Sequence, residues 1–456
     1  MIDPAVREYI EVRRGEQLER LFELLSIPSV ANVQASPDPC ETCATWLADY
    51  LGNLGIEARV VPTAGKPAVL AATPYAAEKP TLLVYGHYDV QPAEPLELWH
   101  TQPFQPVVRD GYIYARGAND DKGQLFAHLL AIEAYRATGT DLPVNLKLLF
   151  EGEEEIGSPN LEPFIESHRA ELAADAAVIS DSEFYADDIP ALTYALRGLA
   201  YAEITFTGPS ADVHSGLHGG ALTNPVNALA ALLAGLHAAD GRVTLPGFYD
   251  NVLPVTNDER EQWHSLPFDE RQYAASLGVD ALGGGEKAFS VMERRWARPT
   301  LDCNGIVGGH TAEGSKTIIP SRAGAKISMR LVSHQDPEEI VAALRQFVSD
   351  HTPPGIRSRL DVHATSRPVT LDTDSPAMRA AQAALEEAFG HSPAMIRCGA
   401  SVPVTELLQR LLGLDAVLMG FGLPDDNLHS PNERFKLDQL YRGATAAAAF
   451  MQNLGG

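Results

Sequence analysis

The chain has 456 residues, of which 45% are hydrophobic and 21% charged, as is ordinary for a globular protein of two or three domains. Its formal net charge of −25 argues against nucleic acid or an anionic membrane surface as a partner. The sequence contains no apolar run of about 18 residues, so we predict no transmembrane helix. Residues 1–25 lack the apolar core of a signal peptide, and we therefore expect a cytoplasmic protein.

The first part of the chain alternates predicted helices and strands. Apolar residues at helical spacing predict helices at 5–25, 40–54, 123–137 and 160–172. Apolar or alternating runs predict strands at 56–61, 68–73, 81–90, 144–150 and 176–182, and a hairpin at 106–114. This alternation predicts an α/β fold, in which a mixed, largely parallel sheet is sandwiched by helices.

The pattern changes near Ala195 and returns to the first style near residue 370. The middle region is predicted to contain strands at 202–208, 324–332 and 359–365, helices at 224–238 and 336–350, and an irregular stretch at 240–300. That order is typical of a small sheet with helices on one face. The first style resumes with a helix at 375–389, a strand at 416–422 and a last helix. We therefore expect an α+β domain of residues 195–368 to be inserted between catalytic segments 1–194 and 369–456.

Four cysteines are too few for a disulfide scaffold. Cys40 and Cys43 form a C-x-x-C pair, but no second pair follows at zinc-ribbon spacing, and this pair opens a predicted helix. The pattern favours structural cysteines over a redox or metal-binding pair, which is the alternative.

Acidic residues and histidines follow the predicted strands. Four glutamates follow the strand at 144–150, and other strand ends and loops carry further carboxylates and imidazoles: Glu151, Glu153, Glu154, Glu155, His87, Asp89, Asp120, Asp121, Asp181 and His429. The carboxyl ends of parallel strands meet at one edge of a sheet, so we expect these side chains to converge. A divalent cation would offset the repulsion among the carboxylates. Imidazole and carboxylate ligands with few thiols suit Zn²⁺, Mn²⁺ or Co²⁺. Any one of these residues alone is more simply explained as a solvated surface or capping residue.

Six motifs in this order resemble the co-catalytic metallopeptidases of the M20 type, and within them the dipeptidase branch that includes the carnosine-type dipeptidases. The motifs are GHYDVQP, RGANDDKG, FEGEEEIGS, ISDSE, DVHSG and LHSPNE. The resemblance covers nearly the whole chain. It implies a di-zinc exopeptidase-like catalytic domain, an inserted lid and dimerisation domain, and a homodimer formed through that domain.

The resemblance also assigns two divalent metal ions, Zn²⁺ or Mn²⁺ with Co²⁺ possible, to particular residues. Asp120 matches the carboxylate that bridges the two ions. His87 and Asp181 match the remaining ligands of one ion, and Glu155 and His429 match those of the other. Two cations held about 3.5–4 Å apart can activate one bridging water and polarise a carbonyl group.

Further catalytic roles follow from the same resemblance. Glu154 matches the general base, which takes a proton from the attacking water and passes it to the leaving amine. Asp89 matches the carboxylate that orients a metal-bound imidazole. For Asp121 the sequence leaves open a ligand role and the capping of the following helix.

The inserted region and a later loop contribute residues that match substrate contacts. His214 matches a histidine that reaches the active site of the partner subunit and helps to stabilise the oxyanion. Arg330 matches an arginine that holds the terminal carboxylate of the substrate, for which a planar guanidinium is well suited. Gly399 and Ser401 match a loop that contacts the same carboxylate.

Taken with the resemblance, the sequence predicts metal-dependent hydrolysis of dipeptides or short peptides with a free C-terminal carboxylate. The attacking water bridges two metal ions, and Glu154 acts as general base. An N-acyl amino acid deacylase or a carboxypeptidase with the same two-metal site is the alternative. A non-catalytic binding protein is disfavoured, because every matched ligand and Glu154 are present.

Overall fold

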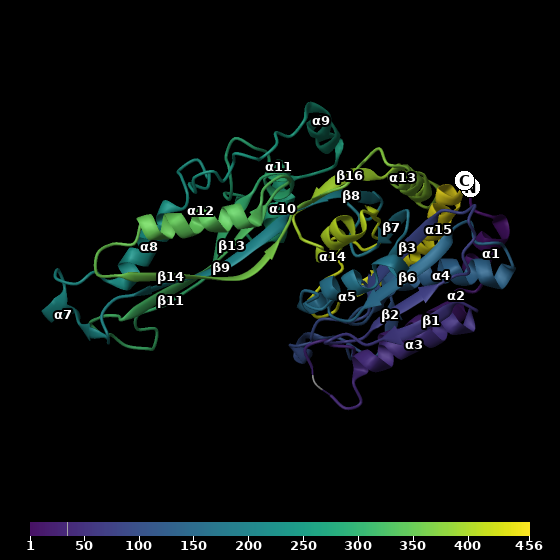
Figure 1. The fold of residues 1–456 in the computed structure, drawn as a ribbon, viewed down its shortest axis with the longest axis horizontal. Coiled ribbons are helices and arrows are strands. Elements are labelled where there is room, and N and C mark those ends of the chain that lie inside the picture. Colours follow the sequence, from purple (N-terminus) through teal and green to yellow (C-terminus); the bar gives the residue numbers. More distant parts are fainter. Residues whose placement is uncertain (34) are drawn as a thin grey trace. The chain divides into compact units, whose positions relative to one another are not determined.

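The computed structural model describes residues 1–33 and 35–456, which form two compact units (Figure 1). The first unit comprises Met1–Tyr194, Leu371–Ile396 and Val402–Gly456, and the second comprises Ala195–Thr370 and Arg397–Ser401. The chain therefore enters the second unit twice, and the short return carries Gly399 and Ser401. Among the described residues, no helix combines the length and the hydrophobicity that crossing a membrane requires.

A mixed sheet forms the centre of the first unit, with strand order β1-β2-β6-β3-β7-β17-β8-β15, in which β15 is Val369–Thr370, and with β16 beside β8. Its strands are β1 (Glu57–Val61), β2 (Ala68–Ala72), β3 (Thr81–His87), β6 (Asn145–Glu151), β7 (Ala176–Ile179), β8 (Ala191–Leu196), β16 (Ala394–Cys398) and β17 (Asp415–Leu418). The neighbours β6, β3, β7 and β17 run parallel, whereas β1, β2 and β8 pair antiparallel with their neighbours. The parallel part predicted from the sequence is therefore the centre of the sheet.

All seven residues of β3 are buried, which requires that both faces of the sheet be covered. Helices provide this cover. The helices are α1 (Pro4–Val12), α2 (Arg14–Leu25), α3 (Pro39–Asn53), α4 (Lys122–Thr138), α5 (Leu161–Ser167), α6 (Arg169–Leu172), α13 (Pro376–Phe389), α14 (Pro403–Leu407) and α15 (Leu437–Gly455). The long helix α15 packs against α4 and α13; α4 packs on β3, α13 packs on β17, and α3 packs on β1 and β2. The single helix expected at 5–25 is two helices, since Arg13 leaves the helical conformation.

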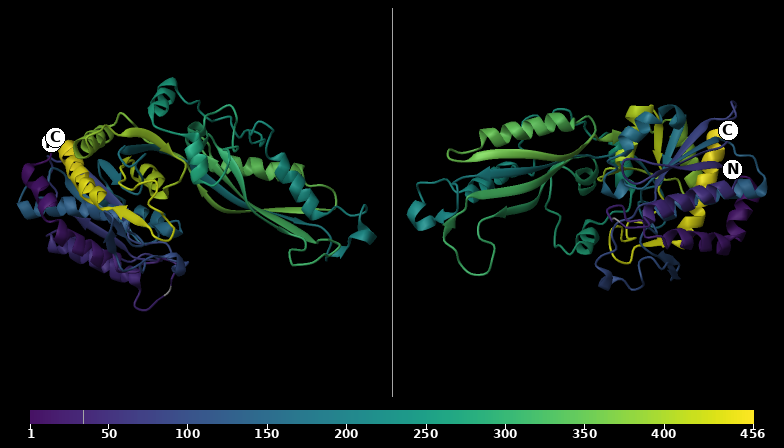
Figure 2. Two further views of the ribbon diagram at one scale, coloured as in Figure 1. Left: turned by 180° about the vertical axis from the view of Figure 1, so that it is seen from behind. Right: turned by 60° about the horizontal axis from the view of Figure 1, so that its bottom comes forward.

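The second unit is built on an antiparallel sheet with strand order β11-β13-β9-β14. Its strands are β9 (Gly198–Thr207), β11 (Thr300–Gly308), β13 (Arg322–Leu331) and β14 (Arg357–Ser366). The helices α8 (Pro225–Gly235) and α12 (Pro337–Asp350) pack on one face of this sheet (Figures 1 and 2). Alternate residues of β9 are accordingly buried, which explains the alternating sequence pattern. The two-residue strands β10 (Val213–His214), β12 (Ile318–Ile319) and β15 (Val369–Thr370) and the turn α7 (Ser215–His218) complete its regular elements apart from the helices described next.

The stretch 240–300, which the sequence predicts to be irregular, contains three short helices: α9 (Asn257–Ser265), α10 (Glu270–Ser276) and α11 (Val291–Trp296). Two of them begin with reciprocal capping boxes, Thr256 with Glu259 and Ser290 with Glu293. This prediction was wrong because it weighted the prolines and glycines and passed over the Thr/Ser-x-x-Glu signals that start a helix.

A small sheet links two loops that matter for the site. Its order is β18-β5-β4, formed by β4 (Val107–Arg109), β5 (Tyr112–Tyr114) and β18 (Arg434–Lys436). Asp110 and Gly111 both adopt positive φ angles at the turn between β4 and β5, as expected for the predicted hairpin. Because β18 pairs with β5, the segment after His429 lies next to the segment before Asp120.

Candidate metal centre

The parallel strands of the first unit deliver charged side chains to one edge of the sheet. His87 is the last residue of β3, Glu154 and Glu155 begin a short helical turn (η2, Glu154–Ile156) after β6, and Asp181 follows β7. Asp120 and His429 arrive on the loops that precede α4 and β18. The sheet thus brings six of the predicted site residues to the rim where parallel α/β sheets place their ligands.

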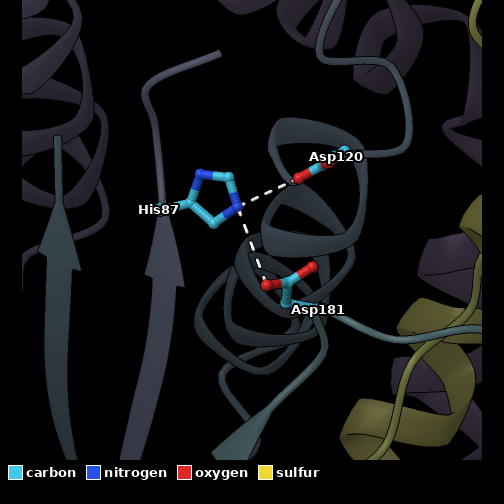
Figure 3. Close-up of side chains that lie close together, drawn as sticks. All are labelled: His87, Asp120 and Asp181. Carbon is cyan, nitrogen blue, oxygen red and sulfur yellow. Dashed lines mark ion pairs between the residues drawn. The ribbon is translucent and has the colours of Figure 1, made fainter. Parts of the chain in front are cut away.

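His87, Asp120 and Asp181 form one group whose ligand atoms all lie within 4.8 Å of one another (Figure 3). Nε2 of His87 lies 3.1 Å from Oδ1 of Asp120 and 3.9 Å from Oδ2 of Asp181. This nitrogen is buried, yet it makes no hydrogen bond with any described residue. A buried imidazole nitrogen that faces two carboxylates without a hydrogen bond suits a cation held among the three side chains.

Asp120, Glu155 and His429 form a second group of the same kind. Nε2 of His429 lies 2.9 Å from Oδ2 of Asp120 and 3.2 Å from Oε2 of Glu155. The two carboxylate oxygens of Asp120 therefore face different histidines, Oδ1 toward His87 and Oδ2 toward His429. That arrangement fits a carboxylate shared between two metal ions.

The cluster carries more negative charge than its buried position favours. Burial raises the pKa of Asp181, and the charge of Asp120 adds to the rise. Burial also raises the pKa of Glu154, although the charge of His87 opposes the rise. Burial by itself would raise the pKa of Asp120, but the hydrogen bond that it accepts from His429 and the nearby charge of His87 hold this pKa well below its ordinary value. A divalent cation would relieve this repulsion and remove the need for the carboxylates to retain protons.

Asp89 connects the two strand ends. Its Oδ1 and Oδ2 accept hydrogen bonds from the main-chain N–H groups of Glu154 (3.2 Å) and Glu155 (3.0 Å). Nδ1 of His87 lies 3.1 Å from the main-chain oxygen of Asp89 and 3.5 Å from its carboxylate. Asp89 thus holds His87 through its carbonyl group, while its carboxylate fixes the turn that carries Glu154 and Glu155.

Gln91 is a site residue that the sequence reasoning missed. Its Nε2 donates to Oε2 of Glu155 at 2.8 Å and to the main-chain oxygen of Glu155 at 3.2 Å. Gln91 lies in the GHYDVQP motif, so its position two residues after Asp89 was the available signal.

The other acidic residues at this rim support the loops. Glu151 and Glu153 are both buried; Glu151 accepts hydrogen bonds from Tyr85 and Ser158, and Glu153 accepts one from Asn160. Asp121 stands at the N-cap position of α4 without capping it, and its Oδ2 lies 3.3 Å from the main-chain nitrogen of His87.

Gly152 is required by a close approach in the same loop. A Cβ atom at this position would lie 2.4 Å from the ring of Tyr88. The glycine therefore lets the loop between β6 and Glu154 pass against that buried aromatic ring.

Cys40 and Cys43 are buried on α3 as thiols that form no disulfide. Burial raises the pKa of Cys40 to about 12 and also raises the pKa of Cys43. Both thiols therefore stay protonated and pack as small apolar side chains, in keeping with the structural interpretation.

The second unit brings together Arg330, Gly399 and Ser401. Nη1 of Arg330 donates to Oγ of Ser401 at 3.1 Å, and that hydroxyl donates to the main-chain oxygen of Arg197 at 2.6 Å. Nε of Arg197 in turn donates to the main-chain oxygen of Gly399 at 3.0 Å. Sequence reasoning missed Arg197, because an arginine near the start of a strand carries no signal by itself.

Arg197 and Arg330 form a pair of like charges. Burial lowers the pKa of Arg197 to about 10, and the charge of Arg330 contributes to the fall. Nη1 of Arg197 is buried without a hydrogen bond to any described residue. Neither guanidinium forms an ion pair with a described carboxylate, and the charge of Asp302 acts on Arg197 without such a contact.

His214 lies elsewhere in the second unit, at the end of β10. Its side chain is exposed, and its Nδ1 accepts a hydrogen bond of 3.0 Å from the N–H group of Gly216, which caps α7.

Comparisons with known proteins show that this chain is similar to metallopeptidases over nearly its whole length. The sequence model of peptidase family M20/M25/M40 matches residues 83–453. The Cys-Gly metallodipeptidase of Schizosaccharomyces pombe is 32% identical over 98% of this chain and 97% of its own length. The crystal structure of human carnosine dipeptidase 1 is 31% identical with a TM-score of 0.82, and covers 99% of this chain and 98% of its own. An M20 family metallo-carboxypeptidase from Sulfolobus solfataricus is 34% identical with a TM-score of 0.86, and covers 96% and 99%.

Proposed function

This chain belongs to peptidase family M20/M25/M40, and we propose that its shared carboxylate, Asp120, joins two metal sites that serve the hydrolysis of dipeptides. The protein is a metal-dependent peptidase, and its cofactors are two divalent metal ions. The observation that carries the proposal is that the two oxygens of Asp120 face His87 and His429 separately.

The proposed ligands are His87, Asp120 and Asp181 for one ion and Asp120, Glu155 and His429 for the other. Their donor atoms are imidazole nitrogens and carboxylate oxygens without a thiol, which supports Zn²⁺ or Mn²⁺, with Co²⁺ as a further candidate. When bound, the ions supply activation of a water molecule and polarisation of the scissile carbonyl group.

The proposed general base is Glu154. Its side chain makes no hydrogen bond with the described residues, whereas its main chain is fixed by Asp89. A carboxylate that lies beside a metal ligand, but binds no metal ion itself, can accept the proton of the attacking water and deliver it to the leaving amine. The hydrogen bond from Nδ1 of His87 to the carbonyl group of Asp89 supports the tautomer in which Nε2 is free to bind a metal ion.

Arg330, Ser401 and Gly399 are the proposed contacts for the terminal carboxylate of the substrate. The proposal is supported by the pair of Arg197 and Arg330. Nη1 of Arg197 is buried without a hydrogen bond to any described residue, and the charge of Asp302 only partly offsets the repulsion from Arg330 and the effect of burial. A carboxylate binds such guanidinium groups through charge-assisted hydrogen bonds.

The inserted unit, including His214, is proposed to act as the lid and to form a homodimer, in which His214 helps to stabilise the oxyanion in the partner subunit. The support is the DVHSG motif and the exposed position of this histidine. The cytoplasmic location is likewise a proposal, supported by the buried cysteines Cys40 and Cys43, which form no disulfide although they lie on the same helix.

A carboxypeptidase activity is the second candidate. It is favoured by the similarity to the Sulfolobus solfataricus metallo-carboxypeptidase, which extends over nearly the whole of both chains. The two activities differ in the length of peptide accepted on the amino side of the cleaved bond, whereas the metal centre and the carboxylate contacts are shared.

A substrate panel tests the proposal. Dipeptides, tripeptides and N-acetyl amino acids would be assayed with the chelated protein and after the addition of Mn²⁺ or Zn²⁺. We expect dipeptides to be cleaved fastest and chelation to abolish the activity until metal is restored. Preferential release of the last residue from tripeptides would support the carboxypeptidase, and faster cleavage of the N-acetyl amino acids would support a deacylase. Hydrolysis that survives exhaustive chelation would contradict the metal mechanism.

A further inference from the structure

Glu433 is a buried carboxylate that the proposed mechanism does not use. It is fully buried, and its two oxygens accept four hydrogen bonds. Oε2 accepts from Nη1 of Arg116 (2.7 Å) and from the N–H group of Gly117 (2.9 Å). Oε1 accepts from the N–H groups of Asn119 (2.9 Å) and Asp120 (3.0 Å). All four donors belong to the loop that carries Asp120.

Glu433 itself ends the loop that carries His429, so this one side chain joins the two loops. A second contact joins them as well, because Oδ2 of Asp426 accepts a hydrogen bond of 3.0 Å from the side chain of Asn119. Each loop supplies one member of the group formed by Asp120, Glu155 and His429.

The chemistry of these contacts requires a carboxylate. A buried negative charge is costly unless it is paired and hydrogen-bonded, and here one guanidinium and three main-chain N–H groups satisfy it. A carboxylate can accept at both oxygens, whereas an amide of the same shape would turn a donor toward one pair of these N–H groups. One of the donors is the main-chain nitrogen of Asp120, whose side chain faces both histidines.

The second metal group has the greater need of such support. The side chain of His87 is fully buried, whereas that of His429 is 55% exposed. Packing therefore fixes the first histidine, but the position of His429 depends on its loop. A carboxylate that ties this loop to Asp120 can set the distance between two ligands that lie far apart in the sequence.

We propose that Glu433 is a positioning residue for the metal centre: it preforms the Asp120, Glu155 and His429 site by holding the loops of Asp120 and His429 together. The proposal rests on the ligand roles proposed above. Outer contacts of this kind typically change metal affinity by about 10- to 100-fold when they are removed.

The test is a titration of the metal-free full-length protein with Mn²⁺ alone, followed by calorimetry and by the electron paramagnetic resonance of the bound ion. For Glu433→Gln we expect one of the two Mn²⁺ sites to weaken by about 10- to 100-fold, with a smaller change at the other. Activity should return toward the wild-type kcat as the Mn²⁺ concentration is raised. A lower unfolding temperature without any loss of Mn²⁺ affinity would contradict the proposal.

Glu133→Gln is the matched control. Glu133 is also a buried glutamate of the first unit that is paired with an arginine, Arg20 at 2.5 Å, but no residue of either ligand loop is among its hydrogen-bond partners. This variant should unfold at a lower temperature and still bind two Mn²⁺ ions with wild-type affinity. Equal weakening of Mn²⁺ binding in both variants would overturn the proposal, since a general loss of stability would then explain it.

Two more variants complete the experiment. Glu433→Asp keeps the negative charge beside Arg116 but is one methylene shorter, so it decides the question if Glu433→Gln does not fold; its Mn²⁺ affinity should lie between those of the wild type and Glu433→Gln. Wild-type affinity at both sites in a folded Glu433 variant would overturn the proposal. His429→Ala separates the premise from the inference, because unchanged Mn²⁺ binding in this variant would reject the ligand assignment itself.

Discussion

The two units of this protein leave opposite charges uncompensated. In the first unit, the carboxylates of Asp120, Glu155 and Asp181 gather where burial raises the pKa of Asp181. In the second unit, burial and the charge of Arg330 lower the pKa of Arg197. The groups of opposite charge near each cluster, His87 and His429 in the first and Asp302 in the second, do not fully offset its charge. The acidic cluster is therefore suited to binding a cation, and the arginine pair is suited to binding an anion.

A third buried charge shows the contrast. Glu133 is buried, and it accepts hydrogen bonds from Tyr9, Tyr50 and Arg20, so that its charge is fully satisfied. Burial of charge by itself therefore marks no site. The metal centre and the arginine pair differ from the internal ion pair of Glu133 because their charges are not fully offset by neighbouring groups.

The largest effect is expected for Glu154→Gln. The variant should keep both metal ions, because Glu154 is not among the proposed ligands, and should lose about 10²- to 10⁴-fold in kcat, because the general base is gone. Metal analysis and the turnover of a dipeptide would measure both quantities. Glu153→Gln is the control, since that neighbouring carboxylate hydrogen-bonds Asn160 and should change kcat far less. A Glu154→Gln enzyme with wild-type turnover would place the base elsewhere.

Arg330→Met should have the next largest effect. Loss of a charge-assisted hydrogen bond of about 1.5–3 kcal/mol predicts a fall of about 10- to 100-fold in kcat/KM for a dipeptide. For a dipeptide amide, kcat/KM should be the same in the variant as in the wild type, because that substrate has no terminal carboxylate for Arg330 to bind. Steady-state kinetics with the matched acid and amide would decide, and equal losses on both substrates would contradict a role in carboxylate binding.

Arg197→Met is expected to act in the same direction and more weakly, by about tenfold in kcat/KM for the acid. Its guanidinium already donates to the carbonyl group of Gly399, so part of its charge serves the loop. Arg322→Met provides a control on the same strand as Arg330, because Arg322 contacts Thr205 and neither Gly399 nor Ser401. An Arg197 variant that behaves like this control would restrict the anion site to Arg330.

The smallest effect on catalysis is expected for Glu133→Gln, which breaks a compensated charge. We expect a loss of about 1–2 kcal/mol in stability, since the carboxylate that accepts from Arg20, Tyr9 and Tyr50 is replaced by a neutral amide. Below the unfolding temperature kcat and KM should be unchanged. Thermal unfolding and steady-state kinetics of the same preparation would measure this. A change in kcat without a change in the unfolding temperature would contradict a purely stabilising role for Glu133.

Much of the arrangement can be predicted from the sequence, because apolar periodicity specifies strands and helices and because parallel strands end at one rim. His87, Asp120, Glu155, Asp181 and His429 were all named on that basis and by family resemblance, and the structure brings them together. The short helices of residues 240–300 were missed, since their signals are local caps within a stretch rich in proline and glycine.

What the sequence by itself determined is therefore the order of the elements and the kinds of side chain that their ends carry. Only the tertiary structure decided which oxygen of Asp120 faces which histidine, that Arg197 stands beside Arg330, and that Glu433 ties the loop of His429 to the loop of Asp120. The physical reason is that these relations join residues up to hundreds of positions apart. Their distances and directions are set by packing and hydrogen bonding between loops, and no local pattern of residues encodes them.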